Sequence, residues 1–288
     1  EDETVTTDAS DDGSSEDATV ILDNNETFKL YAKLAKEGHG DAQYNLAMMH
    51  YNGLGTSQDY KQAVYWYTKA AEQDHLNAEA QLKLGMMHYN GLGTSQDYKK
   101  AVYWYTKAAE QGHLDTEAQS NLGVMHYNGL GTAQDYKQAV YWYTKAAEDG
   151  DAKAQYYLGY MYANGHGVPQ DHKETVYWYT KAATQDYAKA QYKLGHLYAD
   201  AKSIPQDYIK AYTWYEIASD RGEKSAKNDR DEIAKKMTSA EIEEALLFVK
   251  EWLVGSNEDS SKDETVVLEE SDEDGIAKEG VFSFVKDW

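Results

Sequence analysis

One segment recurs three times, nearly unchanged, along this chain of 288 residues. It reads NGLGTSQDYKQAVYWYTKAAEQ at 52–73, returns almost letter for letter at 90–111, and appears again with few changes at 128–149. The tryptophans that mark successive units are 38, 38, 36 and 36 residues apart, at Trp66, Trp104, Trp142, Trp178 and Trp214. A fixed period of this length is typical of a solenoid, in which each unit buries its apolar face against its neighbours.

Each unit contains two patterns with helical spacing. In the first, at 42–52, one stripe holds Ala42, Leu46, Met49 and Gly53. In the second, at 59–71, the stripe holds Tyr60, Ala63, Tyr67 and Ala70, with Trp66 beside it. Segments this short are not stable alone, so each helix must pack on its neighbours.

The residues between the two patterns indicate where the helices end and begin. Asn52-Gly53 supplies a residue that accepts positive φ just past the first helix. Thr56 and Asp59 have the spacing of a capping box, with Asp in place of the usual Glu. In the fourth and fifth units this entry is replaced by Val168-Pro169-Gln170-Asp171 and Ile204-Pro205-Gln206-Asp207, and we expect proline at the first helical position there.

The pattern A-x-x-x-L-G-x-x-Y-x-x-G-x-G-V-x-x-D-x-x-K-A-x-x-W-Y-x-x-A-A resembles the Sel1-like repeat, a relative of the tetratricopeptide repeat. The fourth unit matches at Ala154, Leu158, Gly159, Tyr162, Gly165, Gly167, Val168, Asp171, Trp178, Tyr179, Ala182 and Ala183. The resemblance implies an all-α fold, a right-handed α/α superhelical solenoid, and a non-catalytic scaffold for protein–protein contacts. The first three units depart from it with two extra residues at the joint and with histidine at His50, His88 and His126. The fifth turn, DAKSIPQD, lacks the paired glycines.

These patterns divide the chain into five parts. We predict five repeats over 41–222, preceded by a half repeat at 26–40 and followed by capping helices within 223–255. The last of these helices has a Thr238/Glu241 capping box, and its apolar stripe is expected to hold Ile242, Leu246 and Val249, with Trp252 nearby. The remaining parts are two acidic arms, at 1–25 and 256–288.

Most of the net charge of −22 lies at the two ends. Residues 1–26 carry ten acids and no Lys or Arg, and residues 255–288 carry eleven acids against three Lys. Without a basic surface, nucleic acid and anionic membrane surfaces are not expected partners. The chain also lacks an apolar run long enough to predict a membrane span.

Short β-prone segments lie within the acidic arms. They comprise Val20, Ile21, Leu22, Val266, Val267, Leu268, Val281, Phe282, Phe284 and Val285. If these segments pair as strands between subunits, the chain is a structural subunit of a homo-oligomer or an extracellular filament. This is the alternative to the scaffold function.

The sequence gives little support for an enzyme, a metal site or a cofactor. There is no cysteine, no G-x-S-x-G and no H-E-x-x-H, and the GLG glycines fit turns. The acidic segments 8–17 and 270–280 partly match a calcium loop, but Thr19 and Val281 stand where a bidentate Glu is needed. Solvated acidic chain is the preferred interpretation of both, and His50, His88 and His126 are expected to be packing residues.

We expect a protein or peptide partner, or other copies of the chain, to bind where the first helices differ between units. In repeats of this kind the first helices line the concave face. Position 44 and its equivalents are Tyr44, Leu82, Ser120, Tyr156 and Tyr192, and position 48 and its equivalents are Met48, Met86, Val124, Tyr160 and His196. All ten are predicted to fall off the buried stripe. Within the aromatic block AVYWYT, the tryptophan and one tyrosine per unit are expected to pack between helices, and a carbohydrate-stacking ladder is the less favoured alternative.

The chain begins with Glu1 and not with Met. This start fits either a processed mature chain or a shortened piece. Because the family resemblance also points to envelope settings, we expect an extracytoplasmic or secreted protein whose signal peptide has been removed.

Overall fold

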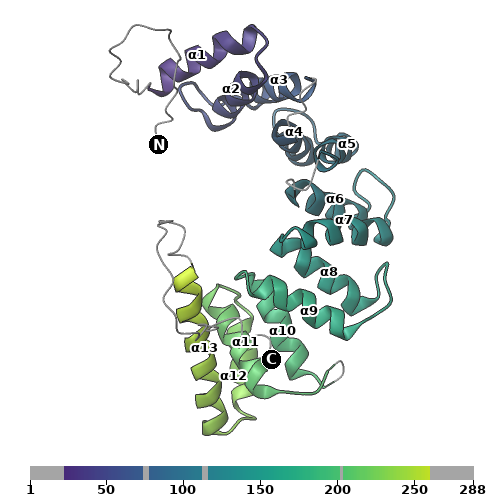
Figure 1. Ribbon diagram of the computed structural model, residues 1–288, viewed down its shortest axis with the longest axis vertical. Coiled ribbons are helices and arrows are strands. Elements are labelled where there is room, and N and C mark those ends of the chain that lie inside the picture. The colour runs from purple at the N-terminus through teal and green to yellow at the C-terminus, as the bar shows by residue number, and fades with distance from the viewer. Residues whose placement is uncertain (1–22, 74–77, 112–115, 202–203, 260–288) are drawn as a thin grey trace, which may run out of the picture. The chain divides into compact units, whose positions relative to one another are not determined.

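The computed structural model describes residues 23–73, 78–111, 116–201 and 204–259 (Figure 1). These ranges contain helices and turns and no strand. The first eight helices are α1 (Asn24–Lys36), α2 (Gly40–Asn52), α3 (Tyr60–Ala71), α4 (Ala78–Asn90), α5 (Tyr98–Ala109), α6 (Thr116–Asn128), α7 (Tyr136–Glu148) and α8 (Ala152–Asn164). The others are α9 (His172–Ala183), α10 (Ala188–Ala199), α11 (Tyr208–Asp220), α12 (Ala226–Ala234) and α13 (Ser239–Asp259).

The chain divides into two compact units, of which the first ends at Gln170 and the second begins at Asp171. In the first unit, α2 packs on α3, α4 on α5 and α6 on α7, each pair forming one repeat. The joints between repeats are made by α3 with α4, α5 with α6 and α7 with α8, and α1 packs on α2. In the second unit α10 packs on α9 and α11, and α11 also contacts α12 and α13. The all-α repeat architecture expected from the sequence is confirmed.

The core of every repeat is built from the same two side chains. The leucine of the first helix is at most 1% exposed in each copy, at Leu46, Leu84, Leu122, Leu158 and Leu194. The tyrosine that follows each repeat tryptophan is at most 2% exposed, at Tyr67, Tyr105, Tyr143, Tyr179 and Tyr215. A small residue on the first helix lets this ring lie close: a Cβ built at Gly123 would be 2.4 Å from the ring of Tyr143.

A buried glutamine at the start of the first helix is hydrogen-bonded to the end of the preceding helix in four of the five repeats. Gln43 Nε2 donates to the carbonyl of Ala35 at 3.1 Å, and Gln155 Nε2 donates to Ala147 at 3.0 Å. Gln81 and Gln191 make the same bond to the second helix before them. This joint holds the last turn of one helix against the first turn of the next, and the sequence analysis did not predict it.

The helix starts differ from the predicted capping box. Asp59 is itself the N-cap of α3, and its side chain accepts hydrogen bonds from the backbone N–H groups of Lys61 and Gln62. Thr56 lies three residues before this cap, so the prediction that it begins the helix was wrong. Pro169 likewise lies two residues before the cap, Asp171, and not at the first helical position. An aspartate caps the second helix of all five repeats because its carboxylate alone satisfies the free N–H groups.

The end of the first helix is as predicted. Gly53 lies just past α2 with φ of 73°, and its N–H donates to the carbonyl of Met49. Gly93 has a second role, because a Cβ there would be 2.2 Å from the carbonyl oxygen of Tyr60 in the preceding repeat. The loop can therefore lie against the backbone of that repeat only with glycine at this position.

The last helix keeps its predicted start but buries a different stripe. Glu241 accepts a hydrogen bond from the backbone N–H of Thr238 at 2.7 Å, which confirms this capping box. Ala245 and Val249 are buried, whereas Leu246 is 42% exposed, so placing Leu246 in the core was wrong. The small Ala245 allows the close approach of α11, whose Thr213 hydroxyl lies 3.5 Å from the Ala245 carbonyl.

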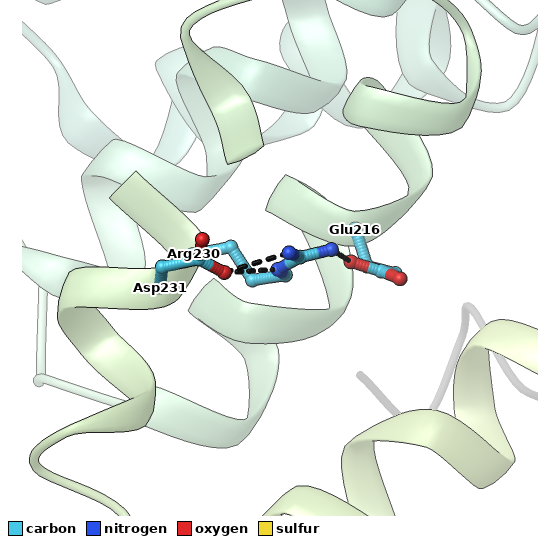
Figure 2. Close-up of polar contacts among 3 residues, drawn as sticks. All are labelled: Glu216, Arg230 and Asp231. Carbon is cyan, nitrogen blue, oxygen red and sulfur yellow. Dashed lines mark hydrogen bonds and ion pairs between the residues drawn. The ribbon is translucent and has the colours of Figure 1, made fainter. Parts of the chain in front are cut away.

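Helix α12 is held to the last repeat by an ion-pair bridge. Arg230 on α12 forms hydrogen bonds with Glu216 on α11 and with its own neighbour Asp231 (Figure 2). Burial alone would lower the pKa of Arg230, but the bonds to these two carboxylates outweigh it and raise the pKa. The guanidinium therefore stays charged and links the two helices.

Candidate interaction surfaces

Most of the predicted first-helix positions are half-buried in the structure. In the first unit these are Tyr44, Met48, Leu82, Met86, Val124, Tyr156 and Tyr160. Ser120 is 2% exposed, so it does not fall off the buried stripe as predicted. We call Met48, Met86, Val124 and Tyr160 the variable row, because they occupy one register position in four consecutive repeats.

The tyrosines at position 44 take part in contacts between repeats. The ring of Tyr44 lies 5.6 Å from that of the buried Tyr67, and its hydroxyl is hydrogen-bonded with Glu79 on the next first helix. Burial, together with this bond and the charge of Glu79, raises the pKa of Tyr44 to about 12. Tyr44 therefore stays protonated at neutral pH and links α2 with the next first helix, α4.

In the last repeat the two predicted residues contact the chain's own α12. The hydroxyl of Tyr192 donates to Asp229 at 2.6 Å, and His196 Nε2 lies 3.6 Å from the same carboxylate. His196 Nδ1 is 3.1 Å from the hydroxyl of Tyr215. Burial, followed by the bond to Asp229, raises the pKa of Tyr192 to about 12. These positions can thus receive a helix that carries a carboxylate.

Aromatic rings close the other end of the variable row. Tyr160 lies 6.1 Å from Tyr127 and 5.9 Å from His166, and His166 stacks on Tyr136 at 4.7 Å. Burial and a hydrogen bond with Tyr160 raise the pKa of Tyr127 to about 12. Three repeats of the row therefore offer aliphatic side chains and the fourth offers a tyrosine.

A second surface, which the sequence analysis missed, lies on the second helices. The tyrosine before each repeat tryptophan is about half exposed, with values of 51% at Tyr65, 53% at Tyr103, 47% at Tyr141 and 49% at Tyr177. Each ring meets the edge of its neighbouring tryptophan at 4.9 Å. A lysine one turn later lies over the ring, as Lys145 does 4.8 Å from the centre of Tyr141. The signal was available, because position 65 lies off the stripe of Tyr60, Ala63 and Tyr67.

Histidines at position 50 and its equivalents pack inside the repeats. Burial is the main cause that lowers the pKa values of His50, His88 and His126. Across the residues that the structure describes, no three His, Cys, Asp or Glu side chains are grouped closely enough to hold a metal ion.

Several predicted features lie outside the described residues. They include all ten arm residues and both acidic segments compared with calcium loops. Among the helices that are described, none is long and apolar enough to cross a bilayer.

Comparison with known protein families matches the Sel1 repeat at residues 15–39, 40–75, 78–113, 116–151, 152–187 and 188–223. This covers more than half of the chain. The chain belongs to the Sel1 repeat family. The first match ends where α2 begins, and it takes in α1 as the second helix of an incomplete repeat. Repeats of this family generally serve as scaffolds for protein–protein interaction.

Solved structures support the same assignment. A Sel1 repeat protein from Oxalobacter formigenes is 36% identical with a TM-score of 0.61, covering 70% of this chain and 81% of that one. The protein c5321, a protective antigen of uropathogenic Escherichia coli, is 28% identical with a TM-score of 0.62, covering 88% and 62%.

A putative Sel1-like repeat-containing protein of Acanthamoeba polyphaga mimivirus, L18, is 44% identical over 41 residues. The match spans 14% of this chain and 7% of that protein. It therefore supports the repeat assignment over about one unit.

Proposed function

We propose that this Sel1 repeat protein is a non-catalytic scaffold that binds a protein or peptide segment along the variable row of its first helices. One observation carries the proposal. The side chains that every repeat shares, the leucine and the tyrosine of the core, are almost completely buried, whereas the side chains of the variable row are partly exposed. The side chains that differ between the repeats thus lie where a partner can contact them.

The chemistry of the row favours a peptide with apolar anchors. Met48, Met86 and Val124 are aliphatic, and methionine adapts to irregular surfaces. Tyr160, the fourth member of the row, adds an aromatic ring at one end. The bond from Tyr192 to Asp229 shows, within the same chain, that a tyrosine at the position equivalent to Tyr44 can hold a carboxylate on an apposed helix.

The test is peptide selection on the intact chain, followed by affinity measurement on matched variants. We expect peptides selected from a displayed library to lose at least about tenfold in affinity for Tyr160→Ala, because an aromatic anchor in an interface typically contributes more than about 1.4 kcal/mol. Tyr103→Ala, which removes an equally large ring from the other surface, is the control.

Equal losses of affinity in both variants would refute the assignment of the face. Selected peptides whose affinity neither substitution lowers would refute it as well. Light scattering on the same sample tests the alternative. A mass that rises with concentration and falls on removal of residues 1–22 or 260–288 would favour a self-assembling structural subunit. We extend the proposal to an extracytoplasmic location, which protease protection in intact cells would check.

A further inference from the structure

Helix α13, the last helix of the described residues, exposes apolar side chains away from the core. Leu246 is 42% exposed, Leu247 60% and Val254 53%. Among the described residues, Leu54 is the only other exposed side chain of the Leu, Ile, Val or Met type. At about 100° per residue, the three side chains of α13 project within about 100° of one another. We call Leu246, Leu247 and Val254 the outer side of α13.

The place of α13 in the array explains why this side is uncovered. Each second helix of the first three repeats packs on the first helix of the next, as α3 does on α4, and α11 packs on α12 in the same way. Helix α13 packs on α11, with Ala245 and Val249 buried. None of the described helices follows it (Figure 1). The end of a solenoid is normally closed by a polar surface, so the apolar outer side predicts a further segment that covers it.

Residues 281–288 follow α13 in the chain and have the composition that this surface requires. They read VFSFVKDW, with five apolar residues and one charge of each sign. Leu247 lies about 18 Å from the end of α13, at about 1.5 Å per residue. Residues 260–280, which connect the helix to this segment, can extend up to about 70 Å at about 3.3 Å per residue. The segment can therefore turn back and reach every part of the outer side.

The other apolar segment of this arm, residues 266–268, fits the outer side less well. Residues 260–265 extend at most about 20 Å, which is needed for the return to Leu247 and leaves no length for the turn. Four acids flank the segment, at Asp263, Glu264, Glu269 and Glu270. Residues 239–254 of α13 carry four glutamates and one lysine, so their net negative charge would repel these acids. Residues 281–288 have no net charge and meet no such repulsion.

A second copy of the chain is also a less suitable occupant. A stable interface between proteins buries about 800 Å² on each partner. The outer side of α13 offers three exposed aliphatic side chains, with the exposed charges of Glu243, Lys250 and Glu251 beside them. A tethered segment needs a smaller contact, because its attachment to α13 keeps it at a high local concentration.

We propose that residues 281–288 dock on the outer side of α13 in their own molecule, with the two phenylalanine rings against the three exposed aliphatic side chains. The docked segment completes the C-terminal cap, because it covers apolar surface that would otherwise remain in water. The apolar end of one array is then not available to the end of another. This closes an end-to-end route of association without involving the variable row.

The experiment uses the full chain with one spin label. The protein has no cysteine, so Lys278→Cys gives a single attachment site three residues before the segment. We expect the amide NMR signals of Leu246 and Leu247 to lose most of their intensity. The loss should be the same in 1 M NaCl as at low salt, because salt screens charges and not apolar contacts. Phe282→Ser combined with Phe284→Ser should restore the signals.

Two further variants test the contact from each side. Val266→Ser combined with Val267→Ser also removes two apolar side chains from the arm, and it should leave the broadening unchanged. Leu247→Gln, at a side chain that is 60% exposed, should restore the signal of Leu246 from the helix side. Unchanged amide signals of α10 and α11 would show that the fold of each variant is intact.

Every other outcome overturns the proposal. It fails if the signals of α13 keep their intensity, or if broadening is confined to the last turn of α13. It fails as well if broadening centres on the cavity lined by Val176, Tyr177 and Ile204, or if the substitutions at Val266 and Val267 restore the signals. Spin-labelled chains are finally mixed with isotope-labelled chains that carry no spin label. Broadening to the same extent in this mixture would assign the docked segment to a second copy and refute docking within one molecule.

Discussion

Replacing Gln43 by methionine tests whether a buried amide holds the joint between repeats. Gln43 is 5% exposed, donates to the Ala35 carbonyl at 3.1 Å and accepts from Gln73 Nε2 at 2.7 Å. Methionine has a similar length but makes neither bond. The Ala35 carbonyl keeps a bond from the N–H of Gly38 at 3.2 Å, so the loss is two hydrogen bonds and not an orphaned acceptor. Each hydrogen bond contributes about 0.5–1.5 kcal/mol, so the free energy of unfolding of the variant should fall by about 2 kcal/mol.

The matched control is Gln58→Met in the same repeat. Gln58 also donates to a backbone carbonyl, that of Tyr51 at 2.8 Å, but it is exposed, so water replaces the lost bond and the cost should stay below about 0.5 kcal/mol. Native-state hydrogen exchange read by mass spectrometry is the assay, because opening in a repeat array is local. Gln43→Met should raise exchange at least about fivefold in α1 and α2 and leave α10 and α11 unchanged. Equal effects from both variants, or a uniform rise along the chain, would refute the reasoning.

Three further predictions follow from the loops, the histidines and the cap. Gly93→Ala should cost about 1–3 kcal/mol more in thermal unfolding than Gly38→Ala, since both have positive φ but only the first would meet backbone atoms; equal costs would contradict this. Burial holds the pKa of His50 below its usual 6.5, so the folded state binds fewer protons and the free energy of unfolding should fall as pH drops through about 6.5. His50→Tyr should flatten that dependence in urea titrations, and an unchanged slope would argue against it. Arg230→Gln should lower the free energy of unfolding by about 1–2 kcal/mol and raise hydrogen exchange in α12. Lys235→Gln, at an exposed ion pair on the same helix end, should produce neither effect.

The repeat period was sufficient to predict the helices because burial follows it directly. Ala42, Leu46 and Met49 are buried where a spacing of 3.6 residues places them, and their equivalents in the later units are buried too, except the partly exposed Leu197 of the fifth. The glutamine joint was missed because a polar residue beside such a stripe is ordinarily solvent-facing. Its signal was in the sequence, since glutamine stands at position 43 in all five units, at Gln43, Gln81, Gln119, Gln155 and Gln191.

Two other features depend on geometry that spacing does not determine. Thr56 and Asp59 are both good caps, and only the path of the loop decides which of them meets the free N–H groups of α3. The block Tyr65-Trp66-Tyr67 turns through 100° per residue, so one ring is buried, one is partly buried and one is exposed. Which of them faces outward depends on how the helix is rotated against its partner.

The two surfaces differ in what they can recognise. The variable row changes from methionine to valine to tyrosine between repeats, so a partner bound there meets a different side chain at each step and can be selected for its sequence. The surface of the second helices offers the same half-exposed tyrosine at every step, at Tyr65, Tyr103, Tyr141 and Tyr177, so it does not distinguish one repeat from the next. A partner that requires a particular sequence is therefore expected on the variable row. Tyr103→Ala should leave the affinity of such a partner unchanged, and Tyr160→Ala should lower it. A loss of affinity in both variants would show that the two surfaces are not independent.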